Sequence, residues 1–127
     1  MVRADAQSPD FLTQLSCGNH RVFADVALEK GGQGSGFRPH DLLEAAFASC
    51  LQITMRMYAN EHEIALGDSH IVVELVRSDD TTTFVYEVVF DRRCSNDDRE
   101  RILDVLSRCP VKKTLSKTIA FDLKSSD

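Results

Sequence analysis

The chain has 127 residues, of which 43% are apolar and 28% charged, and this composition is typical of one globular domain spanning residues 1–127. Fifteen Lys and Arg residues against twenty Asp and Glu residues give a net charge of −5, which argues against a protein that binds nucleic acid or an anionic membrane. Since the N-terminal residues lack the apolar segment of a signal peptide and no apolar run could span a bilayer, we expect a cytoplasmic protein.

The first predicted elements are the two strands of a β-hairpin. Residues 11–16 and 21–28 have the composition of strands, and Cys17-Gly18-Asn19 between them is a turn sequence. Four of the six glycines then fall within residues 30–38, which predicts a mobile loop. Because this loop lacks the Gly-Lys-Ser/Thr ending of a phosphate-binding loop, we interpret it as a flexible flap over a site.

A long helix is predicted over residues 39–60, since Pro39 suits the first helical position and no other Pro or Gly interrupts the segment. Apolar residues cover most of its circumference, which is typical of a helix at the centre of a domain or at a subunit interface. The face predicted to be buried carries six residues at helical spacing: Leu43, Phe47, Cys50, Thr54, Met57 and Tyr58.

The remaining segments predict two strands, a helix and a last strand. Apolar alternation marks residues 70–76 and 82–90 as strands and residues 118–124 as the final strand. Between them, Ser95 or Asn96 can cap a helix, and Pro110 can end that helix and begin a short helical turn. The buried stripe of the helix is predicted to be Ile102, Val105, Leu106 and Cys109. This order of elements predicts an α+β fold with mostly antiparallel pairing.

Two of the four cysteines, Cys50 and Cys109, lie on the apolar stripes of the two helices, so their sulfurs would approach if these stripes pack together. The alternative is that both are small core residues, which is common for free cysteine. Cys50 lies about three turns inside its helix, beyond the reach of the helix dipole, so a reactive thiolate there needs a cation from elsewhere. Cys109 differs because Pro110 places it at a helix start, where backbone N–H groups can stabilise a thiolate.

Other chemistry-bearing residues have simpler interpretations. The four histidines show no metal-ligand spacing, so a zinc site of Cys50, Cys109 and a histidine is a minor alternative, and we expect neither a metal nor a cofactor. Lys112, Lys113 and Lys117 most simply form a solvated face, with docking of an acidic reductant protein as the less favoured alternative.

The run from Gly36 to Cys50, followed by Thr54 and the pair Tyr58-Ala59, resembles the OsmC/Ohr family of bacterial redox proteins. The later pair Cys109-Pro110 matches the second landmark of the family, and the spacing is most similar to that of its short OsmC-like branch. The resemblance implies an α+β OsmC-like fold, with antiparallel sheets around a long central helix. It also implies an intertwined homodimer with two sites at the subunit interface.

The resemblance further implies a thiol-dependent peroxidase. Cys50 would attack an organic hydroperoxide and become a sulfenic acid, Cys109 would resolve it as a disulfide, and a dithiol or a lipoylated protein would reduce the pair. The peroxidases of the family hold the thiolate and the peroxide with an Arg and a Glu, and this chain has His40 in place of that Glu. The candidate residues for this role are Arg21 or Arg38 as the cation, with Asp41 or His40 to orient it.

Leu43, Phe47 and Met57 would form an apolar surround that favours alkyl hydroperoxides, because burying an alkyl tail is favourable. A rival interpretation is a non-catalytic module that binds a small hydrophobic ligand or senses redox state. The missing Glu favours the rival, and the retained cysteine pair opposes it. A purely structural dimer is a third and weaker alternative.

Overall fold

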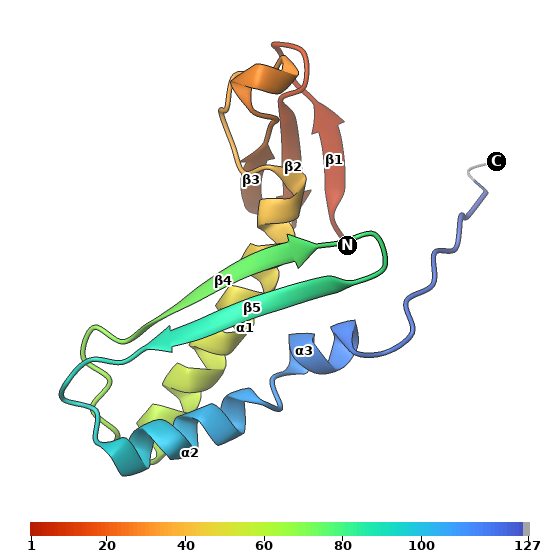
Figure 1. The fold of residues 1–127 in the computed structure, drawn as a ribbon. Helices are drawn as coiled ribbons and strands as arrows, with labels where there is room; N and C mark the ends of the chain where they lie inside the picture. The colour runs from red at the N-terminus through yellow and green to blue at the C-terminus, as the bar shows by residue number, and fades with distance from the viewer. Residues whose placement is uncertain (126–127) are drawn as a thin grey trace. The chain divides into compact units, whose positions relative to one another are not determined.

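The computed structural model describes residues 1–125 and has nine elements (Figure 1). Their order is β1 Arg3–Ala6, β2 Thr13–Cys17, β3 His20–Ala24, η1 Leu28–Lys30, α1 Pro39–Glu61, β4 His70–Arg77, β5 Thr82–Val89, α2 Asn96–Leu106 and α3 Pro110–Leu115. The predicted α+β class with antiparallel pairing is confirmed. The chain divides into two compact units, of which the first holds Met1–Ala45 with Glu74–Val85 and the second holds Ala46–Val73 with the chain from Tyr86 onward.

The first unit contains an antiparallel sheet in the order β1-β2-β3. The predicted hairpin is confirmed, with Cys17 paired to His20 across the turn. Gly18 in that turn has a φ of 57°, a left-handed conformation that glycine adopts without strain. The strand β1 was not expected, because the sequence Arg-Ala-Asp-Ala has little strand character. Its backbone pairing with β2, from Arg3 opposite Ser16 onward, holds it in the sheet.

The glycine-rich segment, predicted to be a mobile flap, is fastened to the first unit by hydrogen bonds from its backbone. The buried carboxylate of Asp25 accepts hydrogen bonds from the backbone N–H groups of Val26 (2.8 Å), Gln33 (3.2 Å) and Ser35 (3.1 Å). The Ser35 N–H contributes most to lowering the pKa of Asp25 below its ordinary value, while burial opposes this and the other two N–H groups assist. Asp25 also explains why β3 ends at Ala24, well before the predicted end at residue 28.

The helix α1 begins at Pro39, as predicted, and ends at Glu61. Its start is stabilised by Asp41, whose carboxylate accepts the backbone N–H of Arg38 at 2.9 Å, as the acidic residue of a capping box does. The buried row, however, differs from the predicted face and consists of Phe47, Leu51, Met55 and Ala59. Of the predicted face, Phe47 is buried, whereas Leu43 is 44% exposed and Met57 is 64% exposed. Apolar residues surround this helix, so composition alone could not select the face that the chain itself covers.

The second unit has the larger set of fully buried side chains. Its α2 is N-capped by Ser95, whose hydroxyl accepts the Asp98 N–H at 3.2 Å, so one of the two predicted caps is confirmed. The side chains of this unit with less than 3% exposure are Leu51, Met55, Ala59, Leu66, Cys94, Ile102, Leu106 and Cys109. Of the predicted stripe, Ile102 and Leu106 are buried on α2 and Val105 is half-buried. Cys109 is buried as well, but its predicted place on this helix is wrong because α2 ends at Leu106.

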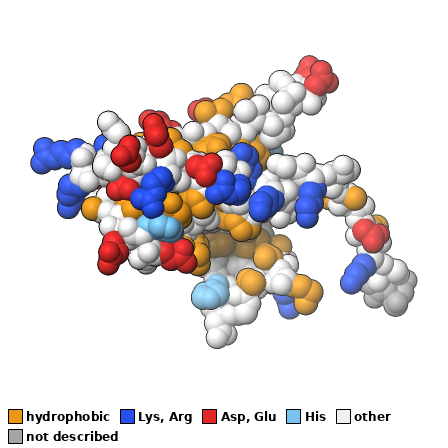
Figure 2. All heavy atoms as spheres, turned by 90° about the horizontal axis from the view of Figure 1, so that it is seen from below, with side chains coloured by type: hydrophobic (Ala, Val, Ile, Leu, Met, Phe, Trp, Pro, Cys, Tyr) orange, Lys and Arg blue, Asp and Glu red, His pale blue; other side chains and the backbone are white. Residues whose placement is uncertain are grey.

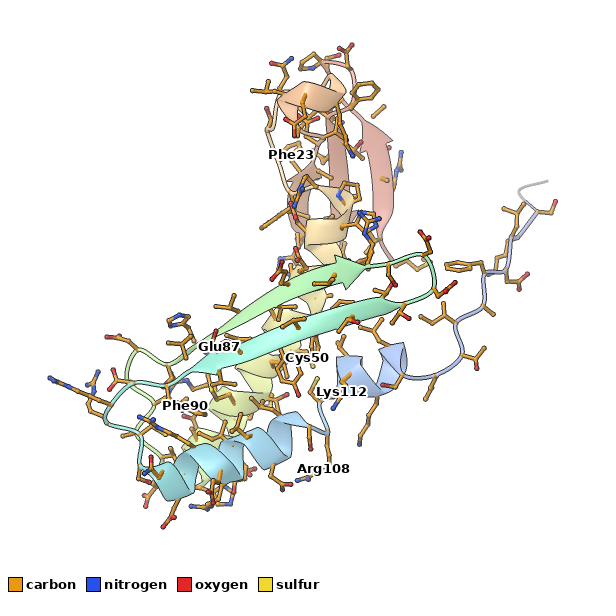
Figure 3. All side chains as sticks on the ribbon, in the orientation of Figure 1. Phe23, Cys50, Glu87, Phe90, Arg108 and Lys112 are labelled. Atoms are coloured by element: carbon orange, nitrogen blue, oxygen red, sulfur yellow. The ribbon has the colours of Figure 1, made fainter. Side chains whose placement is uncertain are left out.

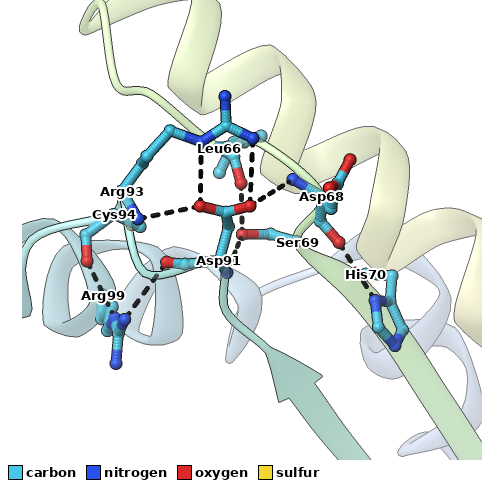
Figure 4. A network of polar contacts seen from close by, with 8 residues as sticks. All are labelled: Leu66, Asp68, Ser69, His70, Asp91, Arg93, Cys94 and Arg99. Atoms are coloured by element: carbon cyan, nitrogen blue, oxygen red, sulfur yellow. Dashed lines mark hydrogen bonds and ion pairs between the residues drawn. The ribbon is translucent and has the colours of Figure 1, made fainter.

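A polar network joins two loops of the second unit (Figure 4). The carboxylate of Asp91 accepts hydrogen bonds from the backbone N–H of Asp68 at 3.0 Å and from the backbone and guanidinium of Arg93. The Ser69 hydroxyl accepts the Asp91 N–H at 2.8 Å. Gly67 has a φ of 54°, and a Cβ atom there would lie 2.5 Å from Asp91 Cγ, so only glycine fits this approach. The network fixes the segments that enter β4 and α2.

The predicted last strand, residues 118–124, is not a strand in the structure. Figure 1 shows this segment as an extended trace after α3. Phe121 is 96% exposed, and Ile119 and Leu123 are exposed as well. Apolar alternation gives a segment one apolar face, but a strand also needs a neighbouring strand to pair with its backbone. The described part of the chain supplies no such neighbour for this segment. Within residues 1–125, no helix is both long enough and apolar enough to cross a membrane.

Candidate functional site

Cys50 and Cys109 belong to the same compact unit, and both are free thiols. Cys50 lies on α1, three residues after the buried Phe47, and its side chain is half-buried (Figure 3). Phe47 packs edge-on against Tyr86 of β5, with ring centroids 5.2 Å apart. Cys109 lies directly before α3 and is fully buried. The structure therefore places in one compact unit the two cysteines that the sequence singled out.

Cys109 is the N-cap residue of α3, as the pair Cys109-Pro110 predicted. Its backbone is extended, with φ −64° and ψ 146°, and Pro110 takes the first helical position, where no backbone N–H is needed. The sulfur accepts the backbone N–H of Lys112 at 3.4 Å. A thiol in the place of the usual Ser or Asp thus satisfies one of the open N–H groups of the helix start.

The pKa of the Cys109 thiol is raised above its ordinary value, chiefly because burial disfavours the thiolate. The Lys112 N–H acts in the opposite direction, and the Cys50 side chain raises the pKa further through a hydrogen bond and through charge. Cys109 is therefore a protonated thiol at neutral pH in the resting protein. The same contacts show that the two thiols are close enough to interact.

The first unit contains the charged candidates Arg38, His40 and Asp41. Arg38 forms a bidentate ion pair with Asp41, with its Nη2 at 2.7 Å from Oδ1 and its Nε at 3.0 Å from Oδ2. Arg38 lowers the pKa of the Asp41 carboxyl to about 2, first through its side-chain hydrogen bond, and the pKa of Arg38 is raised in return. The guanidinium is therefore held in a fixed direction by a carboxylate.

These three residues line a pocket of about 410 Å³ in the first unit. Glu44 and Arg77 line it as well, and the Glu44 carboxylate accepts the Leu75 N–H at 2.7 Å. Sequence reasoning missed Glu44, although a carboxylate one turn after Asp41 on a mainly apolar helix was a signal that could have found it. The pocket collects charges of both signs around the start of α1.

Arg21 lies on β3 and is exposed. It lines a different cavity of the first unit, of about 400 Å³, whose walls are mainly apolar. The other lining residues are Val2, Leu15, Ser16, Cys17, His20, Val22 and Leu42. Arg21 and Arg38 thus occupy different cavities, and both belong to the first unit, whereas the thiols belong to the second. The assignment of a cation to Cys50 stays a prediction.

The zinc alternative gains no support from residues 1–125, in which no three His, Cys, Asp or Glu side chains are grouped to hold a metal ion. The fold and the site define an α+β protein with two thiols in one unit. The thiol of Cys109 is buried and caps a helix, and that of Cys50 is partly accessible and affects the pKa of Cys109. This pairing is typical of a protein that uses its thiols for redox chemistry.

Comparison with known families assigns the chain to one of them. The model of the family described as OsmC-like protein matches residues 32–124, so the chain belongs to the OsmC-like family. No curated protein matches the sequence.

Several solved structures share the fold at low sequence identity. An osmotic stress induced and detoxification response protein from Psychrobacter arcticus 273-4 aligns with a TM-score of 0.75 at 22% identity, over 89% of this chain and 85% of that one. The OsmC like protein from Mycoplasma pneumoniae gives 0.70 at 19% identity, over 91% and 85%. An organic hydroperoxide resistance protein, OsmC, from Legionella pneumophila gives 0.58 at 18% identity, over 91% and 89%.

Proposed function

We propose that this protein reduces organic hydroperoxides, with Cys50 as the attacking thiol and Cys109 as the thiol that resolves the product. The observation that carries the proposal is the placement of the two thiols in one compact unit, where Cys109 caps α3 and the Cys50 side chain raises the pKa of Cys109. Family membership and the fold shared with a protein named for organic hydroperoxide resistance support the same chemistry.

The reaction balances with two thiols and one hydroperoxide. The Cys50 thiolate attacks the outer oxygen, the O–O bond breaks, and the alkoxide takes a proton and leaves as an alcohol. The sulfenic acid on Cys50 is then attacked by the Cys109 sulfur, the S–O bond breaks, and the hydroxide leaves as water with the Cys109 proton. The peroxide gains two electrons and the thiol pair loses two as it forms a disulfide. A dithiol, such as a lipoylated protein, returns these electrons in the cytoplasm.

The different burial of the two thiols supports this division of roles. Since the thiolate and not the thiol is the nucleophile, the raised pKa of Cys109 keeps it from competing for the peroxide. Cys50 is the more accessible of the two sulfurs, which suits the group that meets the substrate. Cys109 needs to ionise only when the sulfenic acid has formed beside it.

The thiolate of Cys50 needs a cation, and Arg21 and Arg38 are the candidates. Arg38 has the better-defined geometry because Asp41 holds it through two parallel hydrogen bonds, and His40 lines the same pocket. We assign Asp41 the role of orienting Arg38, with His40 as its alternative.

A homodimer is part of the proposal. Leu43, Ile53 and Met57 project from α1 with 44% to 64% of their surface exposed, and a second copy would cover them. Leu43 and Met57, together with Phe47, would then line the path of an alkyl group. Such an apolar surround favours alkyl hydroperoxides over hydrogen peroxide.

The test is the intact mass of the protein after one equivalent of cumene hydroperoxide. The wild type should lose two hydrogens, Cys109→Ser should gain one oxygen, and Cys50→Ser should stay unchanged. Cys17→Ser is the matched control, because Cys17 is an exposed thiol of the first unit and its variant should behave as the wild type. An unreacted wild type would sink the proposal.

A second function is favoured by one specific observation, the mainly apolar cavity of about 400 Å³ beside Arg21. A cavity of this kind suits a small hydrophobic ligand, and the protein would then be a binding module or a redox sensor. Such a module would consume no cumene hydroperoxide in the presence of a dithiol, and Cys50→Ser would leave ligand binding intact.

A further inference from the structure

The segment from Val105 to Phe121 has a charge opposite to that of the whole protein. The chain carries a net charge of −5, but this segment contains no Asp or Glu and four basic residues. They are Arg108, Lys112, Lys113 and Lys117, and we call them the basic corner. Asp104 and Asp122 bound the segment, so the positive charge is confined to the residues around Cys109 and α3.

The basic corner is built around the capping thiol. Cys109 is flanked directly by Arg108, and Lys112 donates its backbone N–H to the Cys109 sulfur at 3.4 Å. Figure 3 shows Arg108 and Lys112 on either side of the bend between α2 and α3. Any partner that reaches the thiol pair along this bend therefore meets positive charge.

Much of this positive charge is not neutralised by the protein. Arg108 forms an ion pair with Asp104 at 3.1 Å, but within residues 1–125 no ion pair joins Lys112, Lys113 or Lys117 to an acidic side chain. Lys113 and Lys117 are exposed. Figure 2 shows Lys and Arg side chains in a row that leads toward the C-terminal tail.

We propose that the basic corner is the docking surface for an acidic protein that carries a dithiol and reduces the Cys50–Cys109 disulfide. The inference rests on the proposed function, since it identifies the surface that receives the electron donor. The remaining surface is acidic on balance and repels an acidic partner, so a partner of this charge is steered toward the corner. The patch is small and the protein as a whole acidic, which opposes nucleic acid or a membrane as the occupant.

The reduction that docking permits begins at Cys50, because this residue is half-buried whereas Cys109 is fully buried. One thiolate of the donor attacks Cys50 Sγ, the S–S bond breaks, and the electron pair goes to Cys109 Sγ. There the Lys112 N–H stabilises the leaving thiolate until it takes a proton. The second donor thiolate attacks the mixed disulfide and releases Cys50, so the donor is oxidised to a disulfide and this protein is reduced by two electrons.

The experiment compares two synthetic peptides that share one Cys-x-x-Cys dithiol, flanked by Glu residues in one and by Lys residues in the other. The Cys50–Cys109 disulfide is formed with diamide, and the rate of its reduction is followed by quenched alkylation and mass. At low ionic strength the acidic peptide should react about tenfold faster, which is the lower range of electrostatic steering. The difference should fall toward unity in 0.5 M salt, because screening shortens the range of the charges.

Two charge-reversed variants make the test specific. Lys113→Glu with Lys117→Glu alters the corner without touching either cysteine, and should abolish or reverse the preference for the acidic peptide. Lys30→Glu with Lys124→Glu changes the net charge equally and should keep most of the preference. Dithiothreitol, which is uncharged, should reduce all three proteins at the same rate.

Equal rates for the two peptides with the wild type, or a preference that survives in Lys113→Glu with Lys117→Glu, would overturn the docking surface. Neither result touches the proposed function, which is measured separately by the mass change with cumene hydroperoxide. If diamide forms no Cys50–Cys109 disulfide, the proposed function fails and the docking proposal fails with it.

Discussion

The candidate site residues of the two compact units lie in opposite electrostatic environments. In the first unit the charged side chains of Arg38 and Asp41 pair at the surface, where the pKa of Asp41 is lowered to about 2, first by the hydrogen bond from Arg38. In the second unit Cys109 is fully buried, and burial raises its pKa. The first environment favours the charged form and the second favours the neutral form.

In the proposed function, the thiols and the ion pair proposed to activate them are therefore specified by separate parts of the sequence. A half-buried thiol such as Cys50 needs a cation to become a reactive thiolate, and a surface ion pair has no nucleophile. The proposed peroxidase needs both the thiol pair and the ion pair. Because the two lie in different units, a substitution can remove one and leave the other intact. The predictions below use this independence, from the largest expected effect to the smallest.

Replacement of the attacking thiol should have the largest effect. Cys50→Ser should lower the rate of cumene hydroperoxide consumption with dithiothreitol by about three orders of magnitude or more, because a nucleophile is lost outright. The measurement is the loss of peroxide over time, with Cys17→Ser expected to match the wild type. A Cys50→Ser variant with wild-type activity would show that Cys50 is not the attacking thiol.

Replacement of the resolving thiol should split the reaction into its two steps. Cys109→Ser should react with the first equivalent of peroxide at a rate within a fewfold of the wild type. Without a partner thiol, its sulfenic acid should go on to the sulfinic acid under excess peroxide. Mass spectrometry distinguishes one added oxygen from two. Protection of Cys50 in Cys109→Ser would mean that another group resolves the sulfenic acid.

In the second unit, truncating a buried side chain should destabilise the protein more than truncating an exposed one. Leu106→Ala removes a fully buried side chain and should lower the free energy of unfolding by about 2–5 kcal/mol. Leu103→Ala on the same helix, where the side chain is 47% exposed, should lower it by much less. Chemical denaturation of both variants measures the difference. Equal losses would show that Leu103 is covered in the assembled protein.

In the first unit, Asp25→Asn should loosen the glycine-rich segment. The amide keeps the shape of the carboxylate but replaces one acceptor oxygen by a donor, which faces backbone N–H groups. We expect the midpoint of thermal unfolding to fall by several degrees and proteolysis to increase within residues 31–36. Asp79→Asn, in the exposed turn after β4, serves as the control and should change neither. If Asp25→Asn changes neither the unfolding midpoint nor the proteolysis, the hydrogen bonds to Asp25 are not what holds the glycine-rich segment in place.

The smallest expected effect is a pH dependence in the first unit. The pKa of Asp41 lies below its ordinary value of 3.8, so its ion pair stabilises the folded state above that pH. This contribution should be lost as the pH falls from 3.8 toward about 2, where the folded carboxyl takes up its proton. Asp41→Asn should therefore be less stable than the wild type at pH 6 and approach it at pH 2. A constant difference across this range would contradict the ion pair.

Local sequence determined much of this protein. The pair Cys109-Pro110 specified the N-cap of α3, since proline needs no N–H donor at the first helical position and a sulfur can accept the next free one. Ser95 specified the start of α2 in the same way. The long α1 and the strands β4 and β5 followed from apolar spacing and from the lack of internal breakers. The run from Gly36 to Cys50 and the pair Cys109-Pro110 were enough to show the resemblance to the OsmC/Ohr family before the fold was known.

Only the tertiary structure decided which surfaces are buried and which backbone groups are paired. The face of α1 could not be chosen from a helix that is apolar on most sides, and the row from Phe47 to Ala59 is covered because other parts of the second unit pack against it. The segment over residues 118–124 has the pattern of a strand but no neighbour in the described chain, whereas β1 has little pattern and is held by β2. Periodicity reports the preference of a segment for one apolar face, but burial and strand pairing depend on what lies opposite.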